Sequence, residues 1–320
     1  MRLFLLRSLS ACRLKKVVPI FQLLKSALTH LQANDPIRMA GATAFFSFFA
    51  LPPIVIILST LLSPFLGEQA QGVSGQLFDE LADLFGPKGA RQLEVISHRL
   101  QQPKPSSSLT VLSVFLVLLA STTLFAIVKN SLDQLWNVKS RTKHPLAYFL
   151  RNKLVALTII IGSGFLFALS VTLEQFLGRI STDWMLSTLS YYQIMTDLGH
   201  VVASVLIRMI WFAILFKFLP DIRMAWQAVW LGAAFTSVLF KIGESILSRL
   251  LIHSQLSSLY GHSGAIILVL LFIFYASLIF YYGASFTRQY SDWMHLITEP
   301  RSQAVAYTLK EVEPAKLKRK

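Results

Sequence analysis

One apolar stretch, from Trp226 to Leu251, constrains the fold of this chain more than any other feature. It is long enough to cross a bilayer, yet it carries Lys241 and Glu244 well inside. A charge at membrane depth costs roughly 2.5–3.5 kcal/mol, so such a side chain faces protein or water rather than lipid. Four polar residues of the stretch are spaced by four, three and four positions, which places them on one helical face. They are Ser237, Lys241, Glu244 and Ser248.

The composition places the chain among membrane proteins. Of its 320 residues, 54% are hydrophobic and only 14% are charged, whereas a soluble domain carries about 25% charged residues. The net charge of +14 would suggest nucleic acid in a soluble protein. Here the Lys and Arg residues gather at segment ends, so membrane topology and anionic lipid headgroups explain them better. The single Cys12 excludes an intrachain disulfide and a multi-cysteine metal site.

The apolar segments predict an all-α fold, a polytopic membrane bundle with six transmembrane helices. Each segment has roughly the 20 residues that a membrane helix needs. The expected spans cover about residues 37–63, 109–128, 154–173, 200–219, 226–251 and 265–286.

Three regions flank or interrupt this six-span domain, which covers residues 36–290. Residues 1–35 form a basic segment whose part from Val17 to Leu31 predicts an amphipathic helix. That helix lies either at the cytoplasmic membrane surface or under the bundle. Residues 67–108 carry two short amphipathic patterns, which predict a helical hairpin against the outer rim of the bundle. Residues 291–320 form a basic cytoplasmic tail.

The first span has a marked start and an unusual middle. Asp35 is the expected N-cap, with Pro36 at the first helical position. Pro52 and Pro53 remove two backbone donors in mid-span and predict a kink or a break in the helix. A break in a span can mark a transport site, while a structural kink is the commoner outcome.

The distribution of basic residues sets the orientation. The N-terminal segment, the second and fourth loops and the tail are rich in Lys and Arg, while the third and fifth loops are nearly free of them. By the positive-inside rule both ends of the chain are cytoplasmic. The first loop contains both basic and acidic residues, so it gives this assignment the least support.

The charges inside the spans are expected to meet. Arg208 lies about 18 Å from the inner surface, Lys241 about 24 Å and Glu244 about 28 Å, from the helical rise per residue. The fourth and fifth spans are joined by a tight turn, so they are antiparallel neighbours. We therefore predict a cluster of these three side chains, with Ser237 and Ser248 adding hydrogen bonds. Its role is either a polar pathway that attracts anions or an ion pair that fixes the helix register.

Several sequence motifs between about Asp35 and Tyr290 carry a resemblance to a known family. They are the first-span sequence that begins at Arg38 and ends with Pro52-Pro53, and the turn sequence Phe218-Leu219-Pro220-Asp221-Ile222-Arg223. The other matching positions are Asn130, Trp136, Gly232, Gly261 and Gly283. By these residues the chain resembles the YihY/BrkB family of bacterial inner-membrane proteins, which is similar in having six predicted spans. The chain departs from the family pattern at Ser285, where a Glu is usual, and in offering Phe272 and Phe274 where the sixth span usually has a Trp.

The resemblance implies an inner-membrane protein linked to moving lipid or another envelope amphiphile. The partners to expect are membrane lipids, anionic ones above all, and either a second copy of the chain or an envelope protein. The alternative is a membrane scaffold that transports nothing. An enzyme is not expected, because the chain has no phosphate-binding loop, no HExxH and no GxSxG, and we expect no cofactor and no metal. His200, His253 and His262 fall at the outer ends of spans but lack a zinc-binding spacing.

Overall fold

The computed structural model describes residues 20–66, 90–91, 93–95, 123–141, 154–155, 158–159, 162, 165–166, 190–253 and 263–308. The long helices in this part of the chain are α1 (Ile20–Gln32), α2 (Pro36–Leu66), α7 (Ser190–Phe218), α8 (Trp226–His253) and α10 (Ser263–Trp293). Residues 123–135 are helical as well.

Three stretches among the described residues are long and apolar enough to cross a membrane. They are Val201–Phe218 in α7, Trp226–Ile246 in α8 and Ile266–Trp293 in α10, and they match the predicted spans 200–219, 226–251 and 265–286. The predicted first span lies in α2, where the apolar stretch is Pro36–Leu51. Most of the predicted spans 109–128 and 154–173, and of the hairpin 67–108, lies outside the described residues, so the count of six stays a prediction.

Helix α2 begins as predicted and continues through its two central prolines. The Asp35 carbonyl accepts a hydrogen bond from the Met39 N–H at 3.1 Å, so Asp35 holds the N-cap position. The helix then runs without interruption past Pro52 and Pro53 to Leu66. A break at these prolines was therefore wrongly predicted, while a kink stays a prediction. Proline removes a donor but its φ is compatible with a helix, which allows the backbone to continue.

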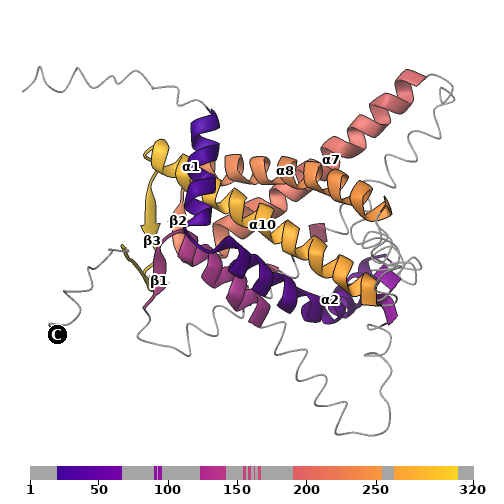
Figure 1. Cartoon of the computed structure of the whole chain (residues 1–320), viewed down its shortest axis with the longest axis horizontal. Helices are drawn as coiled ribbons and strands as arrows, with labels where there is room; N and C mark the ends of the chain where they lie inside the picture. The colour runs from indigo at the N-terminus through magenta and orange to yellow at the C-terminus, as the bar shows by residue number, and fades with distance from the viewer. Residues whose placement is uncertain are drawn as a thin grey trace, which may run out of the picture.

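Helix α10 lies at the centre of the described bundle, in contact with α1, α2 and α8, while α7 packs on α8 (Figure 1). Aromatic rings fill the space between α7 and α10. Phe216 stacks on Phe280 with ring centroids 5.3 Å apart, and Phe212 lies 6.1 Å from the same ring. Tyr281 is fully buried beside them, and its hydroxyl shares a hydrogen bond of 2.6 Å with Thr43 of α2.

Helices α8 and α10 approach each other through two reciprocal glycine–threonine contacts. A Cβ added at Gly232 would lie 1.8 Å from Thr287 Oγ1, and one added at Gly283 would lie 1.9 Å from Thr236 Oγ1. Each threonine hydroxyl donates to the carbonyl four residues earlier on its own helix, which is the carbonyl of Gly232 or Gly283. In this antiparallel pair, a glycine of each helix therefore faces a threonine of the other. Small residues that allow this approach are typical of membrane helix interfaces.

The described part of the chain is mostly helical, as predicted, but it also contains short strands that were not predicted. Strand β1 (Val138–Ser140) pairs antiparallel with β4 (Ala304–Ala306), and β2 (Ile222–Met224) pairs antiparallel with β3 (Thr298–Pro300). Each strand has three residues, too few for an alternating pattern to be recognised in the sequence. Their pairing brings residues 298–306, expected only as a basic tail, back onto two loops of the membrane domain.

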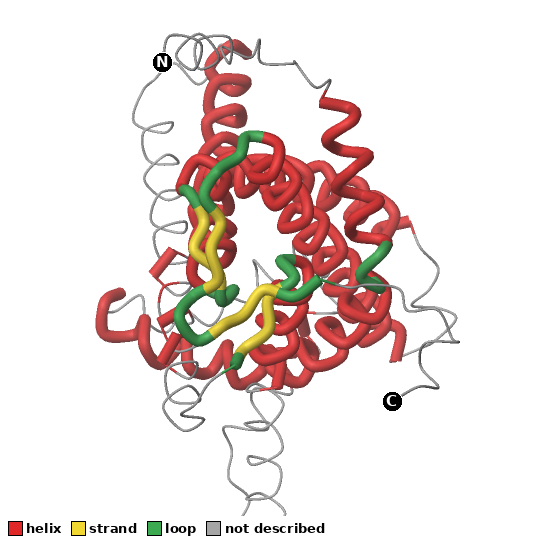
Figure 2. The backbone as a smooth tube through the Cα atoms, turned by 90° about the vertical axis from the view of Figure 1, so that its left-hand side faces the viewer, coloured by secondary structure: helices red, strands yellow, loops and turns green. Residues whose placement is uncertain are grey.

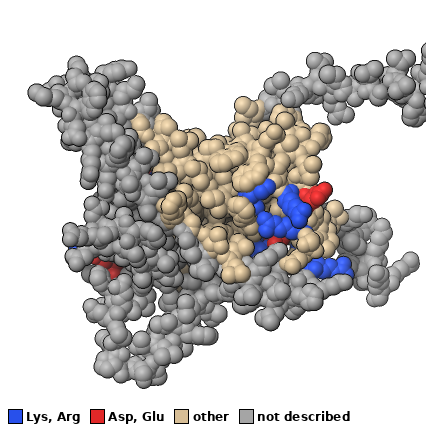
Figure 3. Space-filling model, turned by 180° about the vertical axis from the view of Figure 1, so that it is seen from behind, with Lys and Arg blue, Asp and Glu red and all other residues tan. Residues whose placement is uncertain are grey.

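All four strands gather at one end of the bundle (Figure 2). At this end α2 and α8 begin, while the helix over 123–135, α7 and α10 end. Helix α1 and strand β4, near the two ends of the described chain, therefore lie at the same end of the bundle. Figure 3 shows most of the visible Lys and Arg atoms gathered in one region, beside a wide uncharged surface. That separation fits a membrane protein with one basic, solvent-facing end.

Helix α1 is fixed to the bundle by polar contacts with α10. Ala27 and Leu31 are buried, while the Ser26 hydroxyl donates to Gln289 Oε1 at 2.8 Å. Tyr282 donates to the Leu24 carbonyl at 3.1 Å. The predicted amphipathic helix therefore packs on the bundle by one face. It also exposes apolar side chains elsewhere, Ile20 and Phe21 among them.

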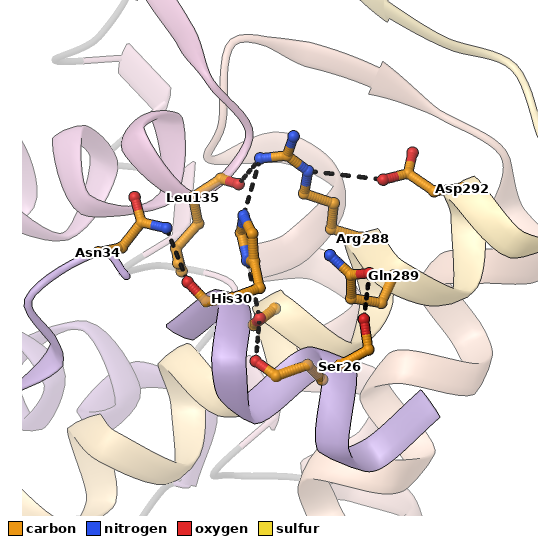
Figure 4. Close-up of polar contacts among 9 residues, drawn as sticks. Ser26, His30, Asn34, Leu135, Arg288, Gln289 and Asp292 are labelled. Carbon is orange, nitrogen blue, oxygen red and sulfur yellow. Dashed lines mark hydrogen bonds and ion pairs between the residues drawn. The ribbon is translucent and has the colours of Figure 1, made fainter. Parts of the chain in front are cut away.

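His30 occupies the centre of this junction (Figure 4). Ser285 donates its hydroxyl proton to the Ala27 carbonyl at 2.7 Å, so it can only accept from His30 Nδ1, 3.0 Å away. On the other side, His30 Nε2 lies 3.1 Å from Arg288 Nη1, which is always a donor. The two contacts assign His30 as the neutral tautomer with its proton on Nδ1. Arg288 Nη1 also donates to the Leu135 carbonyl, which joins α1, α10 and the helix over 123–135.

The glycine–threonine contacts predict that Gly283→Ala destabilises the protein. A methyl group at this position overlaps Thr236 and forces α8 and α10 apart, at a cost of about 1–3 kcal/mol. The matched control is Gly41→Ala, because a Cβ added at Gly41 has nothing within 4 Å. Thermal unfolding in detergent, followed by Trp fluorescence, measures both. Equal melting temperatures for the two variants would contradict the close packing.

The His30 contacts predict a loss of stability in acid. Burial, and then the nearby Arg288 charge, lower the pKa of His30 from 6.5 to about 4. The unfolded chain binds this proton below about pH 6.5 while the folded protein does not, so stability falls as the pH drops from 6.5 towards 4. The loss by pH 4 is at most about 3 kcal/mol.

Hydrogen exchange of the α1 amides at several pH values measures this effect. His30→Gln, which does not titrate, should flatten the pH dependence between 6.5 and 4. The control His295→Gln removes an exposed histidine in the loop after α10 and should behave as the wild type. An unchanged pH dependence in His30→Gln would show that this residue is not the titrating group.

Candidate functional site

The charged side chains of α7 and α8 meet inside the membrane-spanning part of the bundle. Arg208 of α7 contacts Glu244 of α8 through two hydrogen bonds, Nη1 to Oε2 at 2.5 Å and Nη2 to Oε1 at 3.3 Å. Lys241 Nζ lies 3.5 Å from the same Oε2. The tight turn at residues 219–225 makes α7 and α8 antiparallel neighbours, which sets Arg208 opposite Glu244. The structure thus brings together the three charges that the sequence predicted to meet.

The two serines of the predicted set do not both join this cluster. Ser237 is buried and donates to the Ala234 carbonyl of its own helix at 3.0 Å, so it satisfies backbone rather than the charged groups. The side chain of Ser248 lies outside the described residues. The charged cluster, as used below, therefore consists of Arg208, Lys241 and Glu244.

The charged cluster carries one excess positive charge in apolar surroundings. The Arg208 guanidinium lies 5.6 Å from the centroid of the Phe240 ring, a cation–π contact. The side chain of Glu244 is 15% exposed, that of Arg208 26% and that of Lys241 32%. Neighbouring surface positions on both helices are aliphatic and exposed, as lipid-facing residues are. They include Leu206, Ile210, Val238, Ile242 and Ile246.

The three charges differ in how firmly they are held. Arg208 and Glu244 form a two-bond, fork-like pair, which is the strongest geometry available to these groups. Lys241 makes a single, longer contact with the same carboxylate and is the most exposed of the three. Lys241 is therefore the cation whose partner can be exchanged at the lowest cost.

Sequence reasoning missed a second buried charge network, at the strand-bearing end. Lys129 Nζ lies 2.7 Å from Asp133 Oδ2 and 2.6 Å from Asp221 Oδ2, and all three residues are buried. The Asp221 N–H also donates to Asp133 Oδ1 at 2.7 Å. Burial alone would lower the pKa of Lys129, but the two carboxylates outweigh it and raise the pKa above 10.5. The available signal was the four-residue spacing of Lys129 and Asp133, which puts them on one helical face.

Arg301 of the C-terminal tail is hydrogen-bonded to the turn that carries Asp221 of this network. The Arg301 N–H donates to the Asp221 carbonyl at 3.0 Å, and Arg301 Nη2 donates to the Lys217 carbonyl at 3.1 Å. Lys217 in turn donates to the Met224 carbonyl at 2.5 Å and lies 4.9 Å from the Trp226 ring centroid. These contacts fix the turn between α7 and α8, and with it the register of Arg208 against Glu244.

The positions that carry the family resemblance fall into three groups. Gly232 and Gly283 form the α8–α10 contact, and Trp136 is buried in the core. Pro220 is buried in the α7–α8 turn, and Arg223 pairs across the sheet with Glu299. Arg38 donates to Gln134 Oε1 at 3.3 Å, near the strand-bearing end. Asn130 is exposed, and Gly261 lies outside the described residues.

The described residues contain no group of three His, Cys, Asp or Glu side chains that could hold a metal ion. The side chains of His200, His253 and His262 lie outside those residues.

Comparison with known proteins identifies a family for this chain. The family model for virulence factor BrkB matches residues 27–305, most of the chain. A UPF0761 membrane protein of Chromohalobacter salexigens is 22% identical over 284 residues, which are 86% of this chain and 66% of that protein. One from Ralstonia nicotianae is 24% identical over 253 residues, 78% of this chain and 54% of that protein. One from Tolumonas auensis is 20% identical over 259 residues, 80% of both chains.

The chain spans only about half to two thirds of the length of the first two relatives. No solved structure matches it. The family match covers both the α7–α8 turn and the central helix α10, and the matching relatives are bacterial membrane proteins. The chain is therefore a bacterial membrane protein that belongs to the virulence factor BrkB family.

Proposed function

We propose that this protein is a bacterial inner-membrane transporter or flippase that moves a lipid, or another amphiphile of the cell envelope, past the charged cluster of α7 and α8. Both ends of the chain lie in the cytoplasm in this proposal. The observation that carries it is the charged cluster itself, because ionisable residues inside a membrane span are costly and are functional by default. Its net positive charge favours an anionic cargo.

The geometry suggests how the cluster would act on such a cargo. An anionic headgroup that enters between α7 and α8 would take Lys241 as its partner, because Lys241 has the longest contact with Glu244. Arg208 would keep its two hydrogen bonds to Glu244, so no carboxylate would be left unpaired. The exposed aliphatic residues beside the cluster would meanwhile contact the acyl chains.

A second candidate function is that of a membrane scaffold. Both cations of the cluster pair with one carboxylate, which also suits a static link that fixes α7 against α8. In both proposals the protein is not an enzyme and uses no cofactor, and lipids, a second copy or envelope proteins are its partners.

Lys241→Met tests the transport proposal without breaking the Arg208–Glu244 pair. In proteoliposomes that contain fluorescent phosphatidylglycerol, a membrane-impermeant quencher measures how fast the label crosses the bilayer. We expect the variant to slow this crossing about tenfold, equivalent to ~1.4 kcal/mol in the barrier. Its melting temperature should stay within a few degrees of that of the wild type.

The matched control is Lys139→Met, which removes an exposed lysine from strand β1. It should leave the crossing rate unchanged. Glu244→Gln gives the complementary result, because it leaves Arg208 and Lys241 without a carboxylate and should lower both the stability and the rate. A wild-type protein that moves no lipid, with Glu244→Gln merely less stable, would favour the scaffold.

A further inference from the structure

An open groove with several polar side chains in its wall lies beside helix α1, far along the chain from the charged cluster. It opens to solvent and has a volume of about 510 Å³. Its wall is formed by side chains from successive turns of α1, by Ala33 directly after that helix, and by one residue of α10. The lining residues are Gln22, Lys25, Ser26, Thr29, His30, Ala33 and Gln289, and none of them is acidic.

The groove is equipped to donate hydrogen bonds to an anion. Lys25 is exposed at its rim and brings a full positive charge. Gln289 accepts from Ser26 through its amide oxygen, which leaves its amide N–H groups as donors. His30 forms part of the wall but already uses both ring nitrogens, towards Ser285 and Arg288. An ammonium and amide donors without a facing carboxylate match the chemistry of a phosphate group.

The surface beside Lys25 is apolar, which favours a lipid headgroup over a soluble anion as the source of the phosphate. Phe21 precedes Lys25 by four residues and Leu28 follows it by three, so all three side chains share one face of α1. Phe21 is 74% exposed and Leu28 45%. A cation between exposed apolar side chains is the pattern of a helix that lies in the membrane interface. A soluble anion would have no use for this apolar flank.

The position of α1 supports the same assignment. It contacts the C-terminal part of α10, near the end of the bundle where the strands gather (Figure 1). If the spans cross the bilayer, this end lies at the level of the lipid headgroups. The groove is then held at headgroup depth by the Ser26–Gln289 and His30–Ser285 contacts.

We propose that the groove binds the phosphate of an anionic membrane phospholipid, with Lys25 and Gln289 as the donors and the acyl chains against Phe21 and Leu28. The bound lipid anchors α1 to the membrane surface. This inference goes beyond the proposed transport function, because it requires no movement of lipid across the membrane.

Native mass spectrometry of the full chain in detergent tests the proposal, with phosphatidylglycerol or phosphatidylcholine added at equal concentration. Wild type should retain one phosphatidylglycerol more tightly than phosphatidylcholine. Lys25→Glu should weaken this retention at least about fivefold, because it reverses the one charge at the groove. The matched control Lys139→Glu makes the same charge change at an exposed position of β1 and should bind as the wild type does.

Two further arms distinguish the alternatives. Phe21→Ser should weaken retention of the lipid, and a millimolar excess of inorganic phosphate should not displace it. Displacement by phosphate, with Phe21→Ser unchanged, would make the groove a site for free anions and overturn the proposal. Equal retention in Lys25→Glu and Lys139→Glu would overturn it as well. Lys241→Met should keep the groove lipid even if it slows lipid crossing, so this proposal and the transport proposal fail separately.

Discussion

The close approach of α8 and α10 is the contact on which the rest of the structure depends. Lipid tails are as apolar as leucine side chains, so membrane helices associate through fit rather than through the hydrophobic effect. Gly232 and Gly283 allow each helix to receive the other's threonine, and each threonine satisfies its hydroxyl on its own backbone. With this contact in place, α8 holds its charged face towards α7, and α10 offers its other sides to α1 and α2.

The two charge networks of the described chain differ in how completely they are enclosed. Lys129 contacts two carboxylates, and all three groups are buried, so the lysine stays charged where it is held. The Arg208–Glu244–Lys241 group is partly exposed, and its second cation is loosely held. A closed network serves to fix loops at the end of the bundle. The half-open one, among exposed aliphatic residues, is the one that the transport proposal requires to exchange a partner.

Much of the helical architecture could be predicted from the sequence because two features can be read from single segments. They are the length of an apolar segment and the position of a charged residue within it. The bounds of α8 and the meeting of Arg208 with Glu244 followed from helical spacing and a tight turn. The strands could not be predicted in the same way, since three-residue segments carry no period and their partners lie far along the chain. The role of Ser237 was also missed, because a serine in a helix can satisfy its own backbone instead of a neighbour.

Ser285 departs from the family pattern at a position that contacts His30. It stands where the resemblance leads one to expect a glutamate, and it is fully buried between the Ala27 carbonyl and His30. The neutral hydroxyl there orients His30 towards Arg288, while burial and the guanidinium lower the pKa of the imidazole. A carboxylate in the same place would face both His30 and the guanidinium, and would favour a charged histidine. The junction of α1 with α10 would therefore differ physically in any relative that carries the acid.

The pairing of β3 with β2 and of β4 with β1 also sets an order of assembly. Residues 222–224 and 138–140 leave the ribosome long before residues 298–306, so during synthesis the two earlier strands exist without their partners. The hydrogen bonds from Arg301 to the carbonyls of Asp221 and Lys217 likewise form only after Arg301 has been synthesised. The helices can thus be inserted one after another into the bilayer, but the aqueous end of the bundle is completed only when the last part of the described chain has been made.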